Sequence, residues 1–366
     1  MLVSNISVNS TNRNSDGNTF VIYKLVVAVI ELKVLVENEI RNIKDMTNIL
    51  DSIIVFLFIS SPKYIILLKG DFMQTVNDFE DYKILDMASG QKLEKWGDYI
   101  LIRPDPQIVW QDKENETLWK KAHARYIRSS SGGGHWEKLK PMKDSWQIKY
   151  KDLVFNLKPM GFKHTGLFPE QAVNWNYMMD KIKNEKREIK VLNLFAYTGG
   201  ATVACLSAGA SVCHVDSSQG MVNWAKENVK SSSLENAKVR YIVDDVVKFV
   251  KREIRRGNKY DAIVMDPPSY GRGKNGEVWS IEKNLYDLLK DVKLLLSDNP
   301  LFVIVNTYTG GLSGTIISNL LRLAFDEKNL DNISFNEIGI NCEKSMSKLP
   351  CGITTKWENK GEKNGK

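Results

Sequence analysis

Features that mark several other classes of protein are missing from this chain of 366 residues. No stretch offers the roughly 20 uncharged apolar residues that a membrane-spanning helix needs. The start lacks the basic segment that opens a signal peptide, because the first charged side chain is Arg13. The four cysteines form neither a C-x-x-C pair nor another spacing typical of metal ligands, so no metal site is expected. Together these absences predict a protein of the reducing cytoplasm that is not bound to a membrane.

The overall composition is that of an ordinary globular protein. Hydrophobic residues make up 43% and charged residues 26%, which excludes a wholly disordered, collagenous or coiled-coil chain. The net charge of +7 is compatible with an anionic partner such as nucleic acid, but a basic surface without such a role fits it equally well. Residues 1–72 hold seven basic and seven acidic side chains, so the whole excess lies in residues 73–366.

The first 72 residues differ from the rest. Residues 1–19 are rich in Asn and Ser and are expected to be disordered, and the apolar runs 20–35 and 49–68 are interrupted by charges. Residues 69–72 can be encoded by a bacterial ribosome-binding site directly before Met73. Two hypotheses therefore stay open: an N-terminal extension, or an upstream frame that is not translated.

Residues 73–165 are predicted to form a small, mainly antiparallel β-rich domain that binds substrate. Short β-branched or alternating runs at 99–103, 107–110, 146–150 and 153–157 are separated by turn signals. Five of the nine tryptophans fall in this segment. Aromatic side chains on a sheet can stack on bases, but packing in the core is the commoner fate.

A run of Ser and Gly at 129–134 stands between basic and aromatic residues. Its N–H and hydroxyl groups are suited to wrapping an anion, with Arg125 and Arg128 on one side and His135 on the other. These three residues are the candidates for substrate binding. The alternative is a flexible linker, and a lone His is often only a structural hydrogen-bonding group.

Residues 166–356 alternate strands and helices. After a helix expected at 169–183, strands are expected at 190–195, 211–216, 239–243, 262–266 and 302–306, each followed by a helix, and two further strands near 333–340 and 351–357. Such a pattern predicts a parallel sheet covered on both faces, in which ligands bind beyond the carboxyl ends of the strands. The remaining residues, 357–366, are expected to be a disordered tail.

Characteristic residues follow four successive strands of this pattern. The first strand leads into a turn with two glycines at 199 and 200, which allows close approach of a ligand to a helix N-terminus. Asp216 ends the second strand and can accept hydrogen bonds from ribose hydroxyls, and Asp245 follows the third, where it can accept from an adenine amine. The fourth ends in Asp-Pro-Pro-Ser-Tyr at 266–270. Any one such acid is more often a helix cap, but all four in order are hard to explain in that way.

The segment resembles the class I S-adenosylmethionine-dependent methyltransferases, and within them the bacterial 23S rRNA large-subunit methyltransferases. The resemblance rests on L-N-L-F-A-Y-T-G-G at 192–200, V-D-S at 215–217, D-V at 245–246, D-P-P at 266–268 and K-H-T-G-L-F-P-E-Q at 163–171. It implies a Rossmann-like seven-stranded sheet with one antiparallel strand near its C-terminal edge, preceded by the β-rich domain. It also implies S-adenosylmethionine as cofactor, 23S rRNA as partner and a role in rRNA processing.

The resemblance also assigns residues to the site. Cofactor binding is carried over to Thr165, Phe195, Tyr197, Thr198, Gly199, Gly200, Asp216, Ser217, Asp245 and Asp266. The catalytic, acceptor-side residues are Asp266, Pro267, Pro268 and Tyr270.

Departures from the family pattern narrow the chemistry. Members that methylate cytosine C5 have a cysteine after the fifth strand, where this chain has Asn-Thr-Tyr-Thr at 306–309, so covalent chemistry is not expected. Ser269 separates the D-P-P from the aromatic residue that follows it, which weakens the inference that adenine N6 is the acceptor. Ala172 stands where the family often has an arginine, which weakens the transfer of that family's RNA contacts. The prediction is direct methyl transfer to a ring nitrogen or amine. The alternatives are a protein or small-molecule methyltransferase and a cofactor-binding RNA module without catalysis. A nicotinamide enzyme is disfavoured because G-x-G-x-x-G is missing.

Overall fold

The computed structural model describes residues 73–129, 133–273, 276, 278–343, 345 and 347–360. All of these residues belong to one compact unit by their contacts. The hypotheses on residues 1–72, on the Ser/Gly tip at 130–132 and on residues 361–366 lie outside the described residues.

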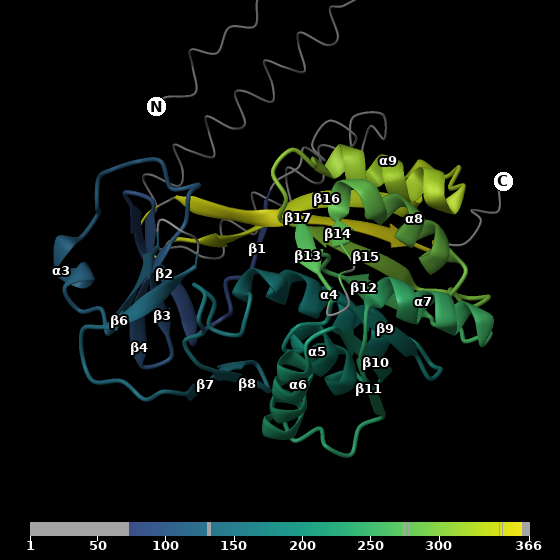
Figure 1. The fold of residues 1–366 in the computed structure, drawn as a ribbon, viewed down its shortest axis with the longest axis horizontal. Helices are drawn as coiled ribbons and strands as arrows, with labels where there is room; N and C mark the ends of the chain where they lie inside the picture. The colour runs from purple at the N-terminus through teal and green to yellow at the C-terminus, as the bar shows by residue number, and fades with distance from the viewer. Residues whose placement is uncertain are drawn as a thin grey trace, which may run out of the picture. The chain divides into compact units, whose positions relative to one another are not determined.

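The largest element of the fold is an eight-stranded sheet in the order β1-β16-β17-β15-β12-β9-β10-β11, which we call the large sheet (Figure 1). Its strands are β1 (Gln74–Thr75), β9 (Lys190–Leu194), β10 (Ser211–Asp216), β11 (Val239–Val243), β12 (Ala262–Met265), β15 (Phe302–Thr307), β16 (Ile333–Asn341) and β17 (Lys348–Glu358). Strands from β15 to β11 pair in parallel, whereas β17 is antiparallel to β15 and β16. The expected seven-stranded methyltransferase sheet with one antiparallel strand is confirmed, and the two-residue β1 adds an eighth strand.

Helices cover both faces of the large sheet. They are η2 (Pro169–Gln171), α4 (Ala172–Lys183), α5 (Gly200–Ser207), α6 (Gln219–Ser231), α7 (Val246–Arg255), α8 (Ile281–Lys293), α9 (Gly314–Phe325) and η3 (Leu330–Asn332). Successive strand residues point to opposite faces. On β9, Val191 packs in the cluster that contains residues of α4, α5 and α6, whereas Leu192 and Leu194 pack in the cluster with residues of α7, α8 and α9. Apolar residues on both faces thus explain the nearly continuous apolar strands of the sequence.

The β-rich region forms a second sheet and a separate hairpin. The sheet has the order β2-β3-β4-β5-β6 and is antiparallel except for a short parallel pairing of β4 with β5. Its strands are β2 (Tyr82–Ala88), β3 (Gln91–Trp96), β4 (Tyr99–Pro104), β5 (Ala124–Arg128) and β6 (Gly134–Lys138), and the hairpin is β7 (Trp146–Tyr150) with β8 (Leu153–Leu157). A short helix, α3 (Glu116–Trp119), precedes β5. Trp96, Trp119 and Trp146 are buried, so packing accounts for these three aromatic side chains.

One local expectation was wrong, and the structure adds to two others. Residues 107–110 form no strand, because their backbone groups bond in a turn, with the Ile108 amide donating to the Asp105 carbonyl at 3.2 Å. An additional hairpin, β13 (Tyr270–Arg272) with β14 (Val278–Ser280), follows the Asp-Pro-Pro segment. Finally, β17 runs from Lys348 to Glu358 and is longer at both ends than the strand expected near 351–357, and its Trp357 packs on Phe325.

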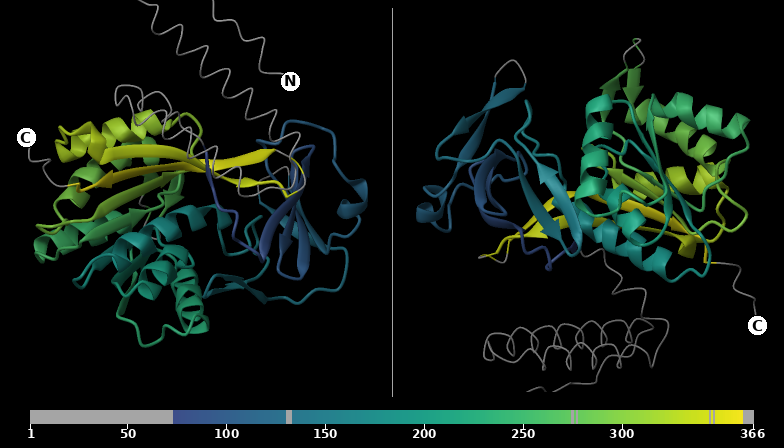
Figure 2. Two further views of the ribbon diagram at one scale, coloured as in Figure 1. Left: turned by 180° about the vertical axis from the view of Figure 1, so that it is seen from behind. Right: turned by 90° about the horizontal axis from the view of Figure 1, so that it is seen from below.

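Two connections join the β-rich region to the large sheet. The β7–β8 hairpin packs on α6, where the Trp224 indole donates to the Asn156 carbonyl at 2.8 Å. The β16 and β17 strands extend to the β-rich region (Figure 2), where Cys342 bridges to Ile84 of β2 and the Gln107 amide donates to the Pro350 carbonyl at 3.0 Å. The β-rich region is therefore joined to the large sheet both through α6 and through the C-terminal strands β16 and β17.

Candidate active site

The turn after β9, residues 195–199, forms the centre of the site. Phe195 and Tyr197 have positive φ angles of 54° and 50°, and Gly199 has a φ of 82°. Non-glycine residues seldom adopt this conformation, and when they do it is often at a functional site. Gly200, which begins α5, lies so close to Trp175 that a Cβ atom would approach the indole to 2.9 Å. The two glycines thus serve the turn and the packing of α5.

Asp216 lies beside this turn at the end of β10. One of its carboxylate oxygens accepts from the Tyr197 amide at 2.9 Å and the other from the Ser218 amide at 2.8 Å. Burial raises the pKa of Asp216, and the two amide donors act against that rise. Each oxygen keeps lone pairs for a further donor, so the carboxylate is held ready for a pair of hydroxyl groups. Ser217, next to it, is exposed.

The K-H-T-G segment (residues 163–166) forms a second wall. The Thr198 hydroxyl donates to the Gly166 carbonyl at 2.5 Å, so the side chain of Thr198 ties the turn to this segment. Thr165 is fully buried, and its hydroxyl finds no hydrogen-bond partner among the described residues. A buried hydroxyl without a partner is costly, which makes Thr165 a candidate contact for a bound ligand.

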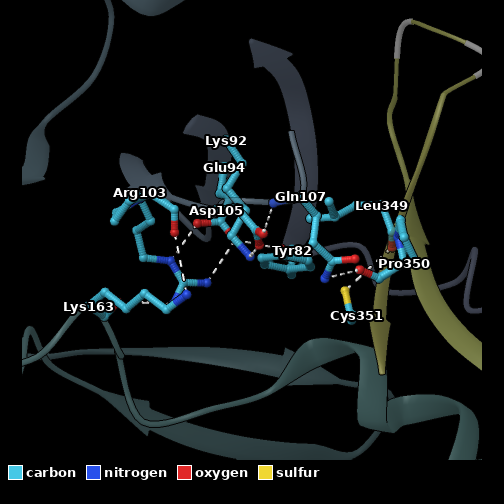
Figure 3. Close-up of polar contacts among 11 residues, drawn as sticks. Tyr82, Lys92, Glu94, Arg103, Asp105, Gln107, Lys163, Leu349, Pro350 and Cys351 are labelled. Carbon is cyan, nitrogen blue, oxygen red and sulfur yellow. Dashed lines mark hydrogen bonds and ion pairs between the residues drawn. The ribbon is translucent and has the colours of Figure 1, made fainter. Parts of the chain in front are cut away.

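A buried ion cluster of the β-rich sheet holds the K-H-T-G segment in place (Figure 3). The Arg103 guanidinium donates to both oxygens of Glu94, at 2.6 and 2.8 Å, and to the Lys163 carbonyl at 3.1 Å. Tyr82 donates to Glu94 at 2.7 Å, and the Lys92 ammonium lies 3.6 Å from the same carboxylate. Arg103 and Lys92 together hold the pKa of Glu94 at about 2, against the effect of burial. Through Arg103, the core of the β-rich region is connected to the wall of the site.

Asp245 caps a helix, as acidic residues after strands often do. Its carboxylate accepts from the Lys248 amide at 2.9 Å at the N-terminus of α7. The neighbouring Asp244 forms an ion pair with Arg252. Contact of Asp245 with an adenine amine therefore stays a prediction, carried only by its place at the end of β11.

Asp266 directly follows β12 and lines a pocket with residues of the turn. Burial, together with the carboxylate of Glu170, raises its pKa to about 8. The pocket is lined by Leu167, Phe168, Gln171, Trp175, Asn193, Phe195, Ala196, Tyr197, Thr198, Gly200, Ala201, Val264, Asp266 and Asn306. The structure thus brings Asp266 together with four of the predicted cofactor residues, Phe195, Tyr197, Thr198 and Gly200.

The residues after Asp266 turn away from the pocket. The Trp279 indole on β14 donates to the Pro268 carbonyl at 2.6 Å, which leaves the Pro267 carbonyl as the acceptor next to Asp266. Tyr270 lies on β13, is 55% exposed and accepts a hydrogen bond from Arg272 at 3.1 Å. The β13–β14 hairpin therefore presents Tyr270 at the surface beside the site.

The three predicted substrate residues lie on different faces of the β5–β6 hairpin. Arg125 pairs with Glu137 at 2.7 Å, and His135 lies on the same face, because it is paired with Ile127. Arg128 lies on the opposite face with Tyr126, which donates to the Gly161 carbonyl at 3.4 Å. Only Arg128 is therefore on the face that packs toward the K-H-T-G segment.

Several site residues were not singled out from the sequence. They are Phe168, Glu170, Gln171, Asn193, Asn306 and Tyr308. Glu170 and Gln171 belong to the quoted K-H-T-G-L-F-P-E-Q motif, and Tyr308 is the first residue after β15. Tyr308 could have been predicted from its position at the carboxyl end of a parallel strand, where ligands bind in such sheets.

The geometry fits S-adenosylmethionine. Asp216 suits ribose hydroxyls, the N-terminus of α5 has no side-chain cap and suits a carboxylate, and the partnerless Thr165 hydroxyl is available to a ligand. Within the described part of the chain, no group of three or more His, Cys, Asp or Glu side chains is arranged to hold a metal ion. No helix among the described residues is long and apolar enough to cross a membrane.

Comparisons with known proteins agree with this geometry. Residues 89–311 match the family described as S-adenosylmethionine-dependent methyltransferase. A crystal structure of the SAM-dependent methyltransferase from Agrobacterium tumefaciens is 32% identical, with a TM-score of 0.75, and the match covers 80% of this chain and 94% of that chain. A second solved structure, of a protein complexed with SAH, shares the fold at 18% identity with a TM-score of 0.59, covering 77% of this chain and 76% of that one.

Curated relatives match over shorter stretches. The ribosomal RNA large subunit methyltransferase K/L of Shewanella frigidimarina is 34% identical over 46% of this chain and 23% of its own length. The ribosomal RNA large subunit methyltransferase I of an Enterobacter species is 29% identical over 46% of this chain and 41% of its own length. The chain thus spans less than half the length of these two relatives.

Proposed function

Because this chain belongs to the S-adenosylmethionine-dependent methyltransferases, we propose that it transfers a methyl group to RNA, specifically to a ring nitrogen or an amine of large-subunit ribosomal RNA. The observation that carries the proposal is the meeting of Asp216, the turn at 195–199 and Asp266 at the carboxyl ends of three neighbouring parallel strands. The cofactor side and the acceptor side of the reaction are then adjacent.

The cofactor side is built from the turn and its two flanking segments. Asp216 would hold the ribose hydroxyls, and the N-terminal amides of α5 would hold the carboxylate. Gly199 lets the backbone turn between them with its positive φ, and Thr165 closes the site from the K-H-T-G segment. When bound, S-adenosylmethionine supplies a methyl group made electrophilic by its sulfonium. The protein contributes positioning, which alone can lower a barrier by several kcal/mol.

The acceptor side is centred on Asp266. An amine or protonated ring nitrogen that gains a methyl group must lose a proton, and the Asp266 carboxylate is placed to accept it. A raised pKa of about 8 lies close to working pH, which suits a group that exchanges a proton in the reaction. The Pro267 carbonyl would orient the acceptor.

Cysteine chemistry does not compete with this proposal. Burial raises the pKa of Cys205 to about 12 and that of Cys213 to about 11, so neither thiol is readily ionised. Burial also raises the pKa of Cys351, whose thiol donates to the Leu349 carbonyl at 3.5 Å. These features favour direct transfer to nitrogen over addition of a thiolate to a pyrimidine.

Support for RNA as acceptor comes from relatives and from charge. The curated relatives named above carry ribosomal RNA in their names. All of the chain's +7 excess lies in residues 73–366, which include the β-rich region and the large sheet. Phosphate backbones attract such an excess without regard to sequence.

The test is to incubate the full chain with methyl-labelled S-adenosylmethionine and extract from a strain that lacks the gene, and to separate RNA, protein and small molecules. Label in large ribosomal RNA is the expected result. Label in the protein or small-molecule pool would refute RNA as acceptor. RNA binding without any label would indicate a module without catalysis. The Asp266→Ala variant should transfer the methyl group at least about tenfold more slowly, which corresponds to a barrier raised by more than about 1 kcal/mol.

A further inference from the structure

Tyr308 lies at the acceptor side of the site, at a place that nothing above assigns to the reaction. It follows β15 directly, and β15 pairs in parallel with β12, which ends next to Asp266. The Tyr308 ring lies 5.9 Å from that of Phe168, at 34° between planes, and Phe168 lies 5.4 Å from Tyr197 of the turn. Three aromatic rings thus lead from the cofactor turn to the acceptor edge, and Tyr308, 37% exposed, ends the series.

A buried amide network fixes the direction of the hydrogen bond at the Tyr308 hydroxyl. The Gln171 side-chain oxygen accepts from the Asn174 amide at 2.8 Å, so the nitrogen of Gln171 faces Tyr308. That nitrogen donates to the Tyr308 hydroxyl oxygen at 2.6 Å. Asn174 is fully buried and is held in turn by Asn306 of β15 at 3.0 Å. Because Tyr308 accepts from Gln171, its own O–H is left to donate to another group.

The charges around Tyr308 keep this hydroxyl protonated. Burial and the carboxylates of Asp266 and Glu170 raise its pKa well above the ordinary value. The hydroxyl is therefore a hydrogen-bond donor at any working pH.

Gly352 on β17 makes room for the ring. A Cβ atom at this position would approach Tyr308 Cδ1 to 2.9 Å and the Thr307 carbonyl to 3.0 Å. The ring is thus packed against backbone at Gly352, while Tyr308 stays 37% exposed.

We propose that Tyr308 receives the acceptor base: its ring provides the surface on which the planar base stacks, and its hydroxyl donates to a hydrogen-bond acceptor in the plane of that base. The inference rests on the proposed function and specifies it. The acceptor is a nucleobase taken out of its stack, which presents a carbonyl oxygen or unprotonated ring nitrogen to Tyr308 while its reacting nitrogen faces Asp266. Tyr286, 38% exposed on α8, lies outside the aromatic series and has no assigned role in the site, so it serves as the control.

Two substitutions at Tyr308 distinguish the contribution of the ring from that of the hydroxyl. Tyr308→Phe keeps the ring and loses the donor, so kcat on RNA should fall by about five- to tenfold, the worth of one hydrogen bond. Tyr308→Leu also loses the stacking surface and should raise the RNA KM by at least about fivefold. In both variants the affinity for S-adenosylmethionine, measured by calorimetry, should stay within about twofold of wild type, because Tyr308 is not among the residues that line the cofactor pocket.

Gly352→Ala gives an independent variant, since it displaces the ring without touching the base. It should reproduce the raised RNA KM of Tyr308→Leu, whereas Tyr286→Phe on α8 should keep wild-type values. Wild-type kinetics in both Tyr308 variants would overturn the inference, as would a loss of cofactor affinity in parallel with turnover, which would indicate a structural role. If the wild type itself labels protein or small molecules instead of RNA, the proposed function fails, and the assignment of a base to Tyr308 fails with it.

Discussion

At the scale of single residues, Asp216 is the side chain on which cofactor affinity depends most directly. Its two oxygens are already held by the amides of Tyr197 and Ser218. In Asp216→Asn, one of these amides would face an NH₂ group, and the negative charge would be lost. We expect the affinity for S-adenosylmethionine, measured by calorimetry, to fall at least about tenfold. Asp144→Asn, on an exposed aspartate that pairs with Lys138, is the control that should leave this affinity unchanged.

Asp266 predicts a specific dependence of stability on pH. Its pKa is raised to about 8 in the folded protein, so between its ordinary value and pH 8 the folded state binds a proton that the unfolded state has lost. The stabilisation is complete below the ordinary pKa, falls as pH rises and is gone above pH 8. Relative to Asp266→Asn, whose side chain cannot ionise, the free energy of unfolding of the wild type should fall by at most about 1.4 kcal/mol per pH unit in this range.

The measurement is urea unfolding of both proteins, without cofactor, from pH 5 to pH 9. The comparison with Asp266→Asn is needed because burial lowers the pKa of His164 to about 4 and of His214 to about 3, and these groups make stability rise with pH up to the ordinary histidine value. Parallel stability curves for the two proteins between pH 5 and pH 8 would show that Asp266 is ionised in the folded state throughout.

At the scale of elements, the sequence predicted the large sheet well and the β-rich region in part. The parallel strands are apolar on both faces, so 211–216 and 239–243 were found with their bounds. In the β-rich region, β2 and β3 were missed, because they carry the buried charges Asp86 and Glu94. Asp86 accepts from the Trp119 indole of α3, and Glu94 pairs with Arg103 of β4, so their partners are distant in the sequence. The separation of Arg125 from Arg128 was missed because the sequence did not predict β5, and alternation along that strand puts the two residues on opposite faces.

The ion pair between Glu94 of β3 and Arg103 of β4 gives a prediction for the K-H-T-G segment, which Arg103 connects to the β-rich region. Glu94→Gln leaves Arg103 buried without its counter-ion, and removal of one partner of a buried pair typically costs about 3–5 kcal/mol. Because Arg103 also holds the Lys163 carbonyl, affinity for S-adenosylmethionine should fall as well. Glu137→Gln breaks the half-exposed pair with Arg125 and should cost less than about 1 kcal/mol of unfolding free energy. Equal losses in both variants would contradict the proposed role of the buried cluster.

At the scale of the whole molecule, the two faces of the β5–β6 hairpin predict which surface meets RNA. Arg128 is on the face that packs toward the K-H-T-G segment, whereas Arg125 is on the other face and is neutralised by Glu137. Arg128→Gln should weaken RNA binding and reduce the slope of log K against log salt concentration by about 0.7–0.9, the value for one lost phosphate contact. Arg125→Gln changes the net charge equally, yet should leave both affinity and slope unchanged. Filter binding at several salt concentrations measures both quantities. If the two variants lose affinity equally, long-range charge rather than this face of the hairpin attracts the RNA, because a general attraction does not distinguish two arginines on one strand.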